Sequence, residues 1–141
     1  MEDNLNRFLK AQERDYATAL SEIKSGRKRS HWMWYIFPQL AGLGLSETSK
    51  FYAIRDKNEA IAFLNHPLLG ARLIEITTAL LSLQQTNPTS IFGQPDDMKL
   101  RSCMTLFAAI DTAPHPVFQR VLDKYFDGKR DQATLQFLRK G

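Results

Sequence analysis

Apolar side chains recur at three- and four-residue intervals along most of the chain, which is the spacing of one face of a helix. The first such segment ends at a glycine in position 26, and its recurring residues are Leu5, Phe8, Leu9, Gln12, Tyr16, Ala19, Leu20 and Ile23. Further segments with this pattern lie at about 46–54, 56–64, 67–85, 97–110, 116–126 and 132–139. The segment 67–85 is strongly apolar, so we expect it to be the central core helix.

Residues that favour helix starts stand before several of these segments. Ser46 is a good N-cap, and Asp56 with Glu59 three residues later forms an aspartate version of the capping box. Pro67 and Pro116 suit a first helical position. No stretch alternates between apolar and polar residues in the manner of a strand. The sequence therefore predicts an all-α fold, a compact single-domain orthogonal bundle of six to seven helices over residues 1–141.

The segment from Trp32 to Phe37 is different, because it has no clear period and four of its six residues are aromatic in a chain that averages 11%. It fits either a buried turn of helix or a short extended segment. As a core plug, its rings supply a large apolar surface. As an extended segment, it would place Trp32 and Trp34 on one side. The Trp32 ring would then stack on an aromatic ligand that also carries phosphate.

Composition limits the class of protein. The chain has 141 residues, of which 43% are hydrophobic and 24% charged, as in one soluble globular domain. Its single cysteine, Cys103, excludes a disulfide framework, and its place on an apolar stripe predicts a buried, unreactive thiol. No cluster of metal ligands is evident, so we expect neither a metal nor a cofactor. The N-terminal residues lack a signal-peptide pattern and no apolar run approaches about 20 residues, which favours the cytoplasm and no membrane.

Positive charge is concentrated near the aromatic segment. Lys and Arg outnumber Asp and Glu by 19 to 15, a net charge of +4. Residues 26–31, the basic loop, include Arg27 and Lys28 and end at His31, directly before Trp32. This placement favours an anionic small molecule as the ligand and leaves nucleic acid open as a partner.

Two further segments carry candidate ligand-binding groups. Gly42 and Gly44 precede a helix cap, where a glycine-rich turn can present backbone N–H groups to an anion. The expected helix 97–110 has polar positions off its apolar stripe that would line a cleft. These positions and the charged residues before them are Asp97, Lys99, Arg101, Ser102 and Thr105. A tight turn and a solvated helix face are the alternative interpretations.

Several motifs extend over nearly the whole chain. They are His31-Trp32-Met33-Trp34-Tyr35-Ile36-Phe37-Pro38-Gln39-Leu40, Gly42-Leu43-Gly44, His66-Pro67-Leu68-Leu69, Asp97, Lys99-Leu100, and Tyr125-Phe126-Asp127-Gly128 with Asp131 and Thr134. Together they resemble a bacterial family, the domain of unknown function numbered 1810. The resemblance implies a compact helical domain and no established activity.

Two other likenesses carry less weight. Members of this family are often labelled calpastatin, but calpain inhibitors of that type are disordered and repetitive, whereas this chain has a core and no repeats. The stretch 92–107 is faintly similar in arrangement to helical proteins that cleave N-glycosidic bonds of ADP-ribose derivatives.

We therefore expect one cleft that binds a phosphate-bearing, nucleotide-derived small molecule. Arg27, Lys28 and Lys99 would neutralise phosphate. Trp32 would stack on a base whose edge Gln39 would bind. The remaining ligand-binding candidates are Gly42, Gly44, Arg101, Ser102 and Thr105. The cleft requires Lys28 and His31 to face the patch from Asp97 to Thr105, and Gln39 to lie near Trp32.

The sequence leaves the activity open. If the ligand is turned over, as by an N-glycosidase or another hydrolase, Asp97 would stabilise an oxocarbenium-like charge or activate water, and His31 would donate a proton. A non-enzymatic module that binds protein or nucleic acid is the alternative, and a structural adaptor is a third. The sequence does not determine the oligomeric state.

Overall fold

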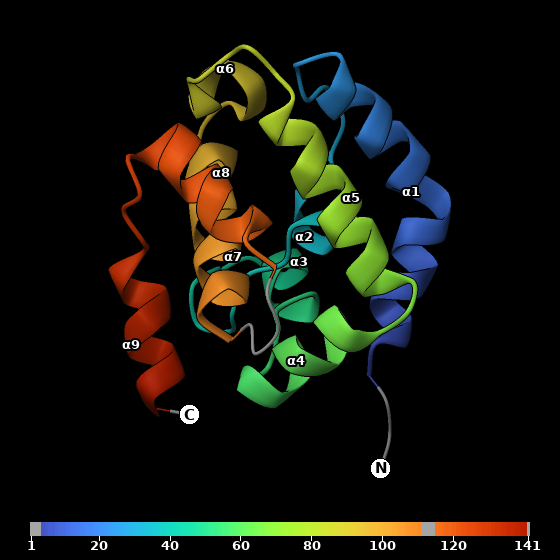
Figure 1. Cartoon of the computed structure of the whole chain (residues 1–141). Coiled ribbons are helices and arrows are strands. Elements are labelled where there is room, and N and C mark those ends of the chain that lie inside the picture. The colour runs from blue at the N-terminus through green and yellow to red at the C-terminus, as the bar shows by residue number, and fades with distance from the viewer. Residues whose placement is uncertain (1–3, 111–114, 141) are drawn as a thin grey trace.

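The computed structural model describes residues 4–110 and 115–140, and these residues form an all-α fold (Figure 1). Among the described residues the six long helices are α1 (Asn6–Lys24), α4 (Lys57–Asn65), α5 (Leu69–Leu81), α7 (Asp96–Ile110), α8 (Val117–Phe126) and α9 (Gln132–Lys140). The three short ones are α2 (Met33–Ile36), α3 (Glu47–Phe51) and α6 (Pro88–Phe92). The predicted fold class is confirmed. None of the described helices has the length and hydrophobicity needed to cross a membrane.

Two helix starts follow the capping signals in the sequence, whereas α5 begins at Leu69, two residues after the predicted start at Pro67. The Ser46 hydroxyl accepts a hydrogen bond from the Ser49 N–H at 3.1 Å, and the Asp56 carboxylate accepts one from the Glu59 N–H at 2.9 Å. The short helix α6 lies between the segments 67–85 and 97–110, where the sequence pattern predicts no helix. Its start combines Asn87 as N-cap with a proline in the first turn, so residues typical of a turn here begin a helix.

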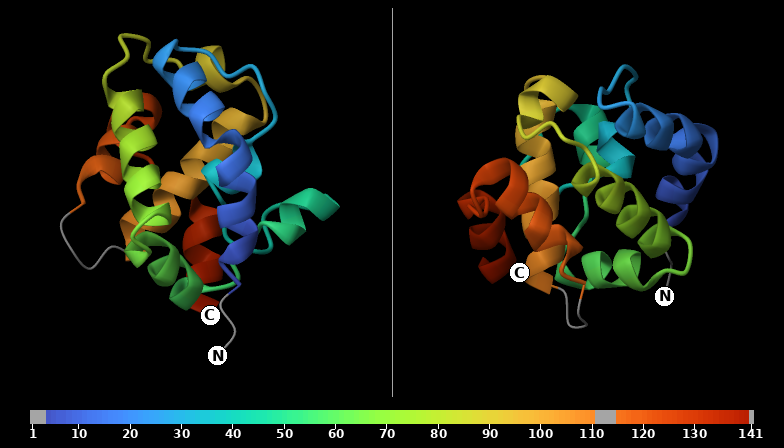
Figure 2. Two further views of the ribbon diagram at one scale, coloured as in Figure 1. Left: turned by 90° about the vertical axis from the view of Figure 1, so that its right-hand side faces the viewer. Right: turned by 45° about the horizontal axis from the view of Figure 1, so that its top comes forward.

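The centre of the core is α7, not the segment 67–85 that the sequence favours. Helix α7 packs closely against α4, α6, α8 and α9, as Figure 1 and both views of Figure 2 illustrate. A series of ring contacts crosses the core, with centroid separations of 5.0 Å for Phe8–Phe63, 5.6 Å for Phe63–Phe107 and 5.8 Å for Phe107–Phe118. These rings connect α1, α4, α7 and α8 into one apolar interior.

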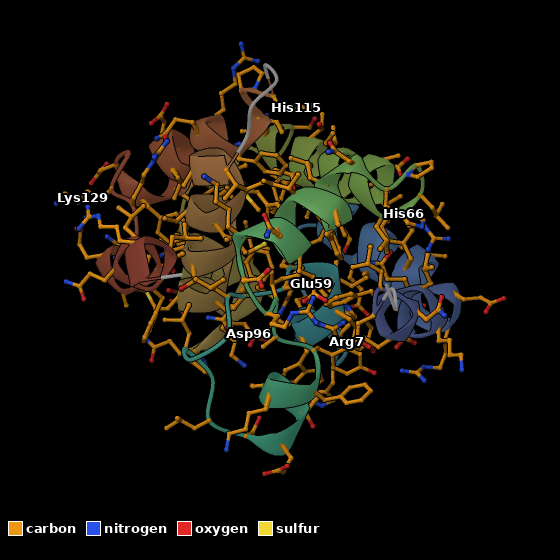
Figure 3. The ribbon with its side chains drawn as sticks, turned by 90° about the horizontal axis from the view of Figure 1, so that it is seen from below. Arg7, Glu59, His66, Asp96, His115 and Lys129 are labelled. Carbon is orange, nitrogen blue, oxygen red and sulfur yellow. The ribbon has the colours of Figure 1, made fainter. Side chains whose placement is uncertain are left out.

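The segment formed by residues 41–53, which includes α3, projects from the body of the molecule (Figure 2, left, and Figure 3). Its two ends are joined by an isolated parallel bridge between Leu40 and Ile54. In that bridge the Ala41 N–H donates to the Ile54 carbonyl at 2.7 Å, and the Ile54 N–H donates to the Gln39 carbonyl at 2.8 Å. The segment therefore leaves the core and returns to it at one place.

Candidate functional site

An open groove of about 460 Å³ lies between the 41–53 segment and the first turns of α7 and α9. Apolar side chains on its two walls include Leu45, which is 84% exposed, and Met98, which is 47% exposed. Polar residues from α7 and the start of α9 line it as well, among them Lys99, Ser102 and Asp131. The volume falls within the range of about 300–1,000 Å³ that is typical of small-molecule sites.

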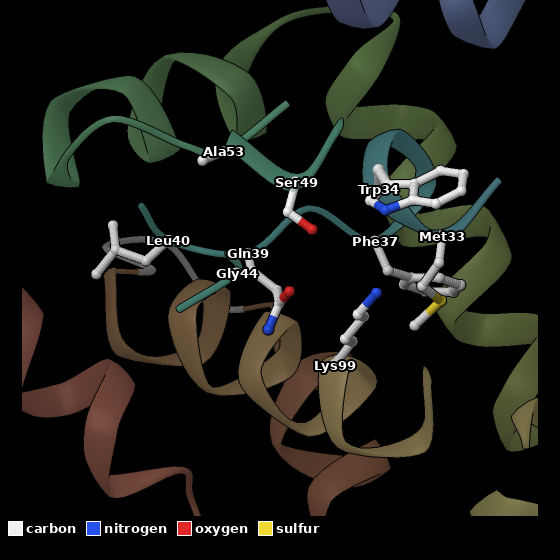
Figure 4. Close-up of a pocket in the computed structure, with 9 residues that line it drawn as sticks. All are labelled: Met33, Trp34, Phe37, Gln39, Leu40, Gly44, Ser49, Ala53 and Lys99. Carbon is white, nitrogen blue, oxygen red and sulfur yellow. The ribbon is translucent and has the colours of Figure 1, made fainter. Parts of the chain in front are cut away.

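A narrower recess leads inward from the groove beneath Trp34 (Figure 4). The groove and the recess share Gln39, Gly44, Ser49 and Lys99, so they lie side by side. The Gln39 amide, the Ser49 hydroxyl and the Lys99 ammonium point toward a common space in Figure 4. Among the described residues the Gln39 side chain has no hydrogen-bond partner, which leaves its amide available to a ligand.

Two lysines share a single carboxylate at the edge of this recess. The Lys28 ammonium lies 2.9 Å from Asp96 Oδ2, and the Lys99 ammonium lies 3.6 Å from Asp96 Oδ1. The Lys28 N–H also donates to the Ile91 carbonyl at 2.8 Å. The basic loop therefore meets the start of α7 at Lys28, through Asp96, which directly precedes the expected patch from Asp97 to Thr105.

The Glu22 carboxylate of α1 fixes the basic loop. It accepts hydrogen bonds from Arg29 N–H at 2.8 Å, Ser30 N–H at 3.0 Å, Ser30 hydroxyl at 2.6 Å and Trp32 Nε1 at 2.9 Å. Partial desolvation raises the pKa of Glu22, but the hydrogen bonds, led by the Ser30 hydroxyl, outweigh it and lower the pKa to about 2. The loop is thus tied to α1 by an ionised side chain.

The stacking role expected of Trp32 does not fit the structure. Its side chain is 1% exposed, and its ring contacts Phe37 and lies 5.1 Å from the Lys28 ammonium. A helical turn at 33–36 replaces the extended segment that would have presented both tryptophans, so Trp32 is a core residue. Trp34 lines the recess instead, together with Phe37 and Gln39, and its ring centroid lies 5.8 Å from the Lys99 ammonium.

The two residues expected to perform acid–base chemistry lie apart from the groove lining. Asp97 is 5% exposed, and its oxygens accept hydrogen bonds from the Thr89 hydroxyl at 2.6 Å and the Met98 N–H at 2.8 Å. Successive helical residues point about 100° apart, so Asp96 faces Lys28 while Asp97 closes the turn between α6 and α7. His31 is exposed, and its ring centroid lies 6.5 Å from that of Trp34.

Arg101 and Thr105 hold the chain before α9 rather than line the groove. The Arg101 guanidinium donates to the carbonyls of Lys129 at 2.9 Å and Arg130 at 3.0 Å. Thr105 is fully buried, and its hydroxyl accepts from the Asp131 N–H at 2.9 Å. Their polarity is explained by these internal hydrogen bonds, although Ser102 between them does line the groove.

Gly42 and Gly44 are explained by their backbone conformation and by the close packing around them. Gly42 has φ +100°, and a Cβ there would lie 3.4 Å from the Phe137 ring of α9. A Cβ on Gly44 would lie 2.5 Å from the Ser49 Cβ, so only glycine allows this close approach to α3. Gly44 thereby brings Ser49 to the recess, whereas Gly42 and the exposed Arg27 do not line the groove.

Comparison with known proteins assigns the family. A family model described as "Protein of unknown function (DUF1810)" matches residues 2–138. The chain belongs to the DUF1810 family. The crystal structure of the conserved hypothetical protein Rv1873 from Mycobacterium tuberculosis is similar, with a TM-score of 0.94 and 44% sequence identity over 97% of each chain. No curated protein matches the chain.

In this DUF1810 protein, sequence reasoning missed several residues that line the site, among them Asp131, Trp34 and Ser49. Asp131 was visible only as part of the family motif, and its position before a helix indicated no more than a cap. Trp34 was expected either in a core plug or beside Trp32 on an extended segment, and nothing in the sequence around Ser49 indicated a site. Among the described residues no group of three His, Cys, Asp or Glu is placed to hold a metal ion.

Proposed function

We propose that the groove binds a small, phosphate-bearing, nucleotide-derived molecule and that Lys99 neutralises its phosphate. The observation that carries this proposal is the sharing of Asp96 by Lys28 and Lys99. Two ammonium groups and one carboxylate leave a net charge of +1. Lys28 has the shorter ion pair and a side chain only 8% exposed, whereas Lys99 lines both groove and recess. The surplus charge therefore faces the recess end of the site, where it favours an anion, while the Asp131 carboxylate lines the groove beyond Ser102.

The rest of the site suits the remainder of such a molecule. The Gln39 amide lines the groove and offers both a donor and an acceptor to the edge of a base, whereas the recess beneath Trp34 has room for about one water molecule. Leu45 and Met98 provide apolar contact at the walls. A few polar groups among apolar walls are typical of a small-molecule site.

Binding has more support than hydrolysis. Both oxygens of Asp97 are occupied by internal hydrogen bonds, so this carboxylate is not poised to activate water. The non-enzymatic alternative, a surface that binds nucleic acid, would place the contacts on exposed residues of the basic loop such as Arg27 instead of in the groove.

Thermal melting with a panel of anions tests the proposal. The panel contains ADP, ADP-ribose, ribose 5-phosphate, inorganic phosphate and a short oligonucleotide. A ligand at a hundred times its dissociation constant adds about 2.7 kcal/mol to the free energy of unfolding. We expect a nucleotide to raise the melting temperature, and Lys99→Gln to weaken its binding about tenfold or more, because a charge-assisted hydrogen bond is lost.

Lys10→Gln is the matched control, because it removes the same charge from an exposed position on α1. Equal binding by wild type and Lys99→Gln would contradict the proposal. So would stabilisation by the oligonucleotide alone, with an affinity that falls steeply with salt, since that pattern indicates a phosphate-tracking surface.

A further inference from the structure

Asp131 presents one engaged and one available oxygen at the groove. Its Oδ2 atom accepts hydrogen bonds from the Thr134 hydroxyl at 2.6 Å and the Thr134 N–H at 3.1 Å, and it lies 3.3 Å from the Ser102 hydroxyl, whose single proton it shares with the Met98 carbonyl at 3.2 Å. Its Oδ1 atom has no hydrogen-bond partner among the described residues. The side chain is half-buried and lines the groove. A carboxylate in this setting can accept hydrogen bonds from a ligand without giving up its own.

The position of this carboxylate is fixed from several sides. The Asp131 N–H donates to the Thr105 hydroxyl at 2.9 Å, and the two preceding carbonyls are held by Arg101. Thr105 and Arg101 belong to α7, the central helix of the core. Because its partners are buried or on a rigid helix, the Asp131 side chain loses little conformational entropy when a ligand binds.

The groove therefore carries a cation and a carboxylate a short distance apart. Lys99 and Ser102 are three residues apart on α7, an axial rise of about 4.5 Å, and Ser102 contacts Asp131 directly. An ionised carboxylate only accepts hydrogen bonds, so the ligand group that faces it must be a donor. In a nucleoside phosphate the group joined to the phosphate is the sugar, whereas the base lies further away.

From this arrangement we propose that the groove selects a ribose with its vicinal hydroxyls, which donate to Asp131 while the phosphate contacts Lys99. The inference rests on the proposed function and specifies its substrate class as ribonucleotides. Carboxylates that bind ribose hydroxyls are a recurrent solution in nucleotide sites. A bound nucleotide without these two hydroxyls would displace water from the available oxygen of Asp131 and leave that oxygen without a hydrogen bond. Such a nucleotide should therefore bind less tightly.

The test compares ADP with 2′,3′-dideoxy-ADP by calorimetry. We expect the wild type to bind ADP about tenfold or more tightly than the dideoxy compound, because hydrogen bonds to a charged acceptor are lost. In Asp131→Asn we expect this preference to disappear. Asparagine is itself a favoured N-cap, so α9 is expected to stay capped and the melting temperature to stay within a few degrees. Asp123→Asn, at an exposed position of α8, is the matched control.

The outcomes separate the inference from the proposed function. Equal wild-type affinities for the two nucleotides would overturn the ribose inference and leave phosphate binding intact. An unchanged preference for ADP over the dideoxy compound in folded Asp131→Asn would also overturn it, because another residue would then bind the ribose hydroxyls. Failure of both nucleotides to bind would overturn the proposed function and the inference with it.

Discussion

At the scale of single residues, Glu22 has the clearest structural role in the basic loop. Its carboxylate binds the backbone of Arg29 and Ser30, the Ser30 hydroxyl and the Trp32 indole. These bonds favour the ionised form, so they hold the pKa of Glu22 at about 2 despite partial desolvation. Because Lys28 belongs to the same loop, Glu22 also positions Lys28 against Asp96.

Glu22→Gln is expected to lower the free energy of unfolding at pH 7 by about 1 kcal/mol, a modest value because solvent screens a partly exposed carboxylate. The folded-state pKa of Glu22, about 2, lies below its ordinary value of 4.5. Its contribution is therefore complete above about pH 4.5 and is lost as the pH falls toward 2. The difference between wild type and variant should shrink over that range.

Urea unfolding at pH 7, 4 and 3 measures this difference. Glu13→Gln is the control, since it removes an exposed carboxylate from the same helix. A difference that stays constant with pH, or an equally large effect of Glu13→Gln, would contradict the role assigned to Glu22.

Neighbouring residues show why sequence patterns predicted site residues only in part. Asp96 and Asp97 are adjacent residues of the same type, so the sequence does not distinguish them. Because successive helical residues point in different directions, Asp96 faces Lys28 and Asp97 faces Thr89. The buried Trp32 indole N–H donates a hydrogen bond to Glu22, and no local sequence pattern indicates this partner. Cys103 lies on an apolar stripe and is buried as predicted, and this burial raises the pKa of its thiol well above the ordinary value.

At the scale of elements, the 41–53 segment depends on Arg7 of α1. The guanidinium donates to the carbonyls of Phe51 at 2.8 Å and Ala53 at 2.7 Å, and it lies 3.0 Å from the Glu59 carboxylate. The Arg7 and Glu59 side chains are only 8% and 3% exposed. Figure 3 shows the pair between α1 and α4, above the projecting α3. One side chain thus joins α1, α4 and the end of the segment that forms a groove wall.

Arg7→Met is expected to lower the free energy of unfolding by about 3–5 kcal/mol, because it leaves a buried carboxylate without its cation. The double variant Arg7→Met/Glu59→Gln should recover part of the loss, since the unpaired charge is then removed. Urea unfolding measures both, and amide exchange should become faster in the 41–53 segment.

Arg14→Met on the same helix is the control, because the Arg14 side chain is 68% exposed and should contribute less than about 1 kcal/mol. Similar effects of Arg7→Met and Arg14→Met would contradict the structural role of Arg7.

The elements themselves were largely predictable. Periodicity and caps predicted each long helix, because these signals depend on residues a few positions apart. The central position of α7 was not predictable. Its interior includes Asp97, Ser102 and Thr105, whose polarity is satisfied by hydrogen bonds from distant residues and conceals the burial of the helix.

At the scale of the whole molecule, the candidate site lies between α7, at the centre of the core, and the projecting 41–53 segment. Helix α7 contributes Lys99 and Ser102 from the centre of the core, whereas the 41–53 segment is held at its base by the bridge and by Arg7. Desolvation arguments predicted that the basic loop and the α7 polar face would meet. They did not predict which cation faces the groove, because that depends on helical rotation and on the path of the 41–53 segment.

The most direct measurement of the central claim is an amide NMR titration of the assigned protein with ADP. The account predicts saturable chemical-shift changes centred on Gln39, Gly44, Ser49, Lys99 and Ser102, with loss of these changes in Lys99→Gln. Changes confined to the exposed residues of the basic loop, or no saturable change at millimolar ADP, would contradict the claim that this groove binds a phosphate-bearing small molecule.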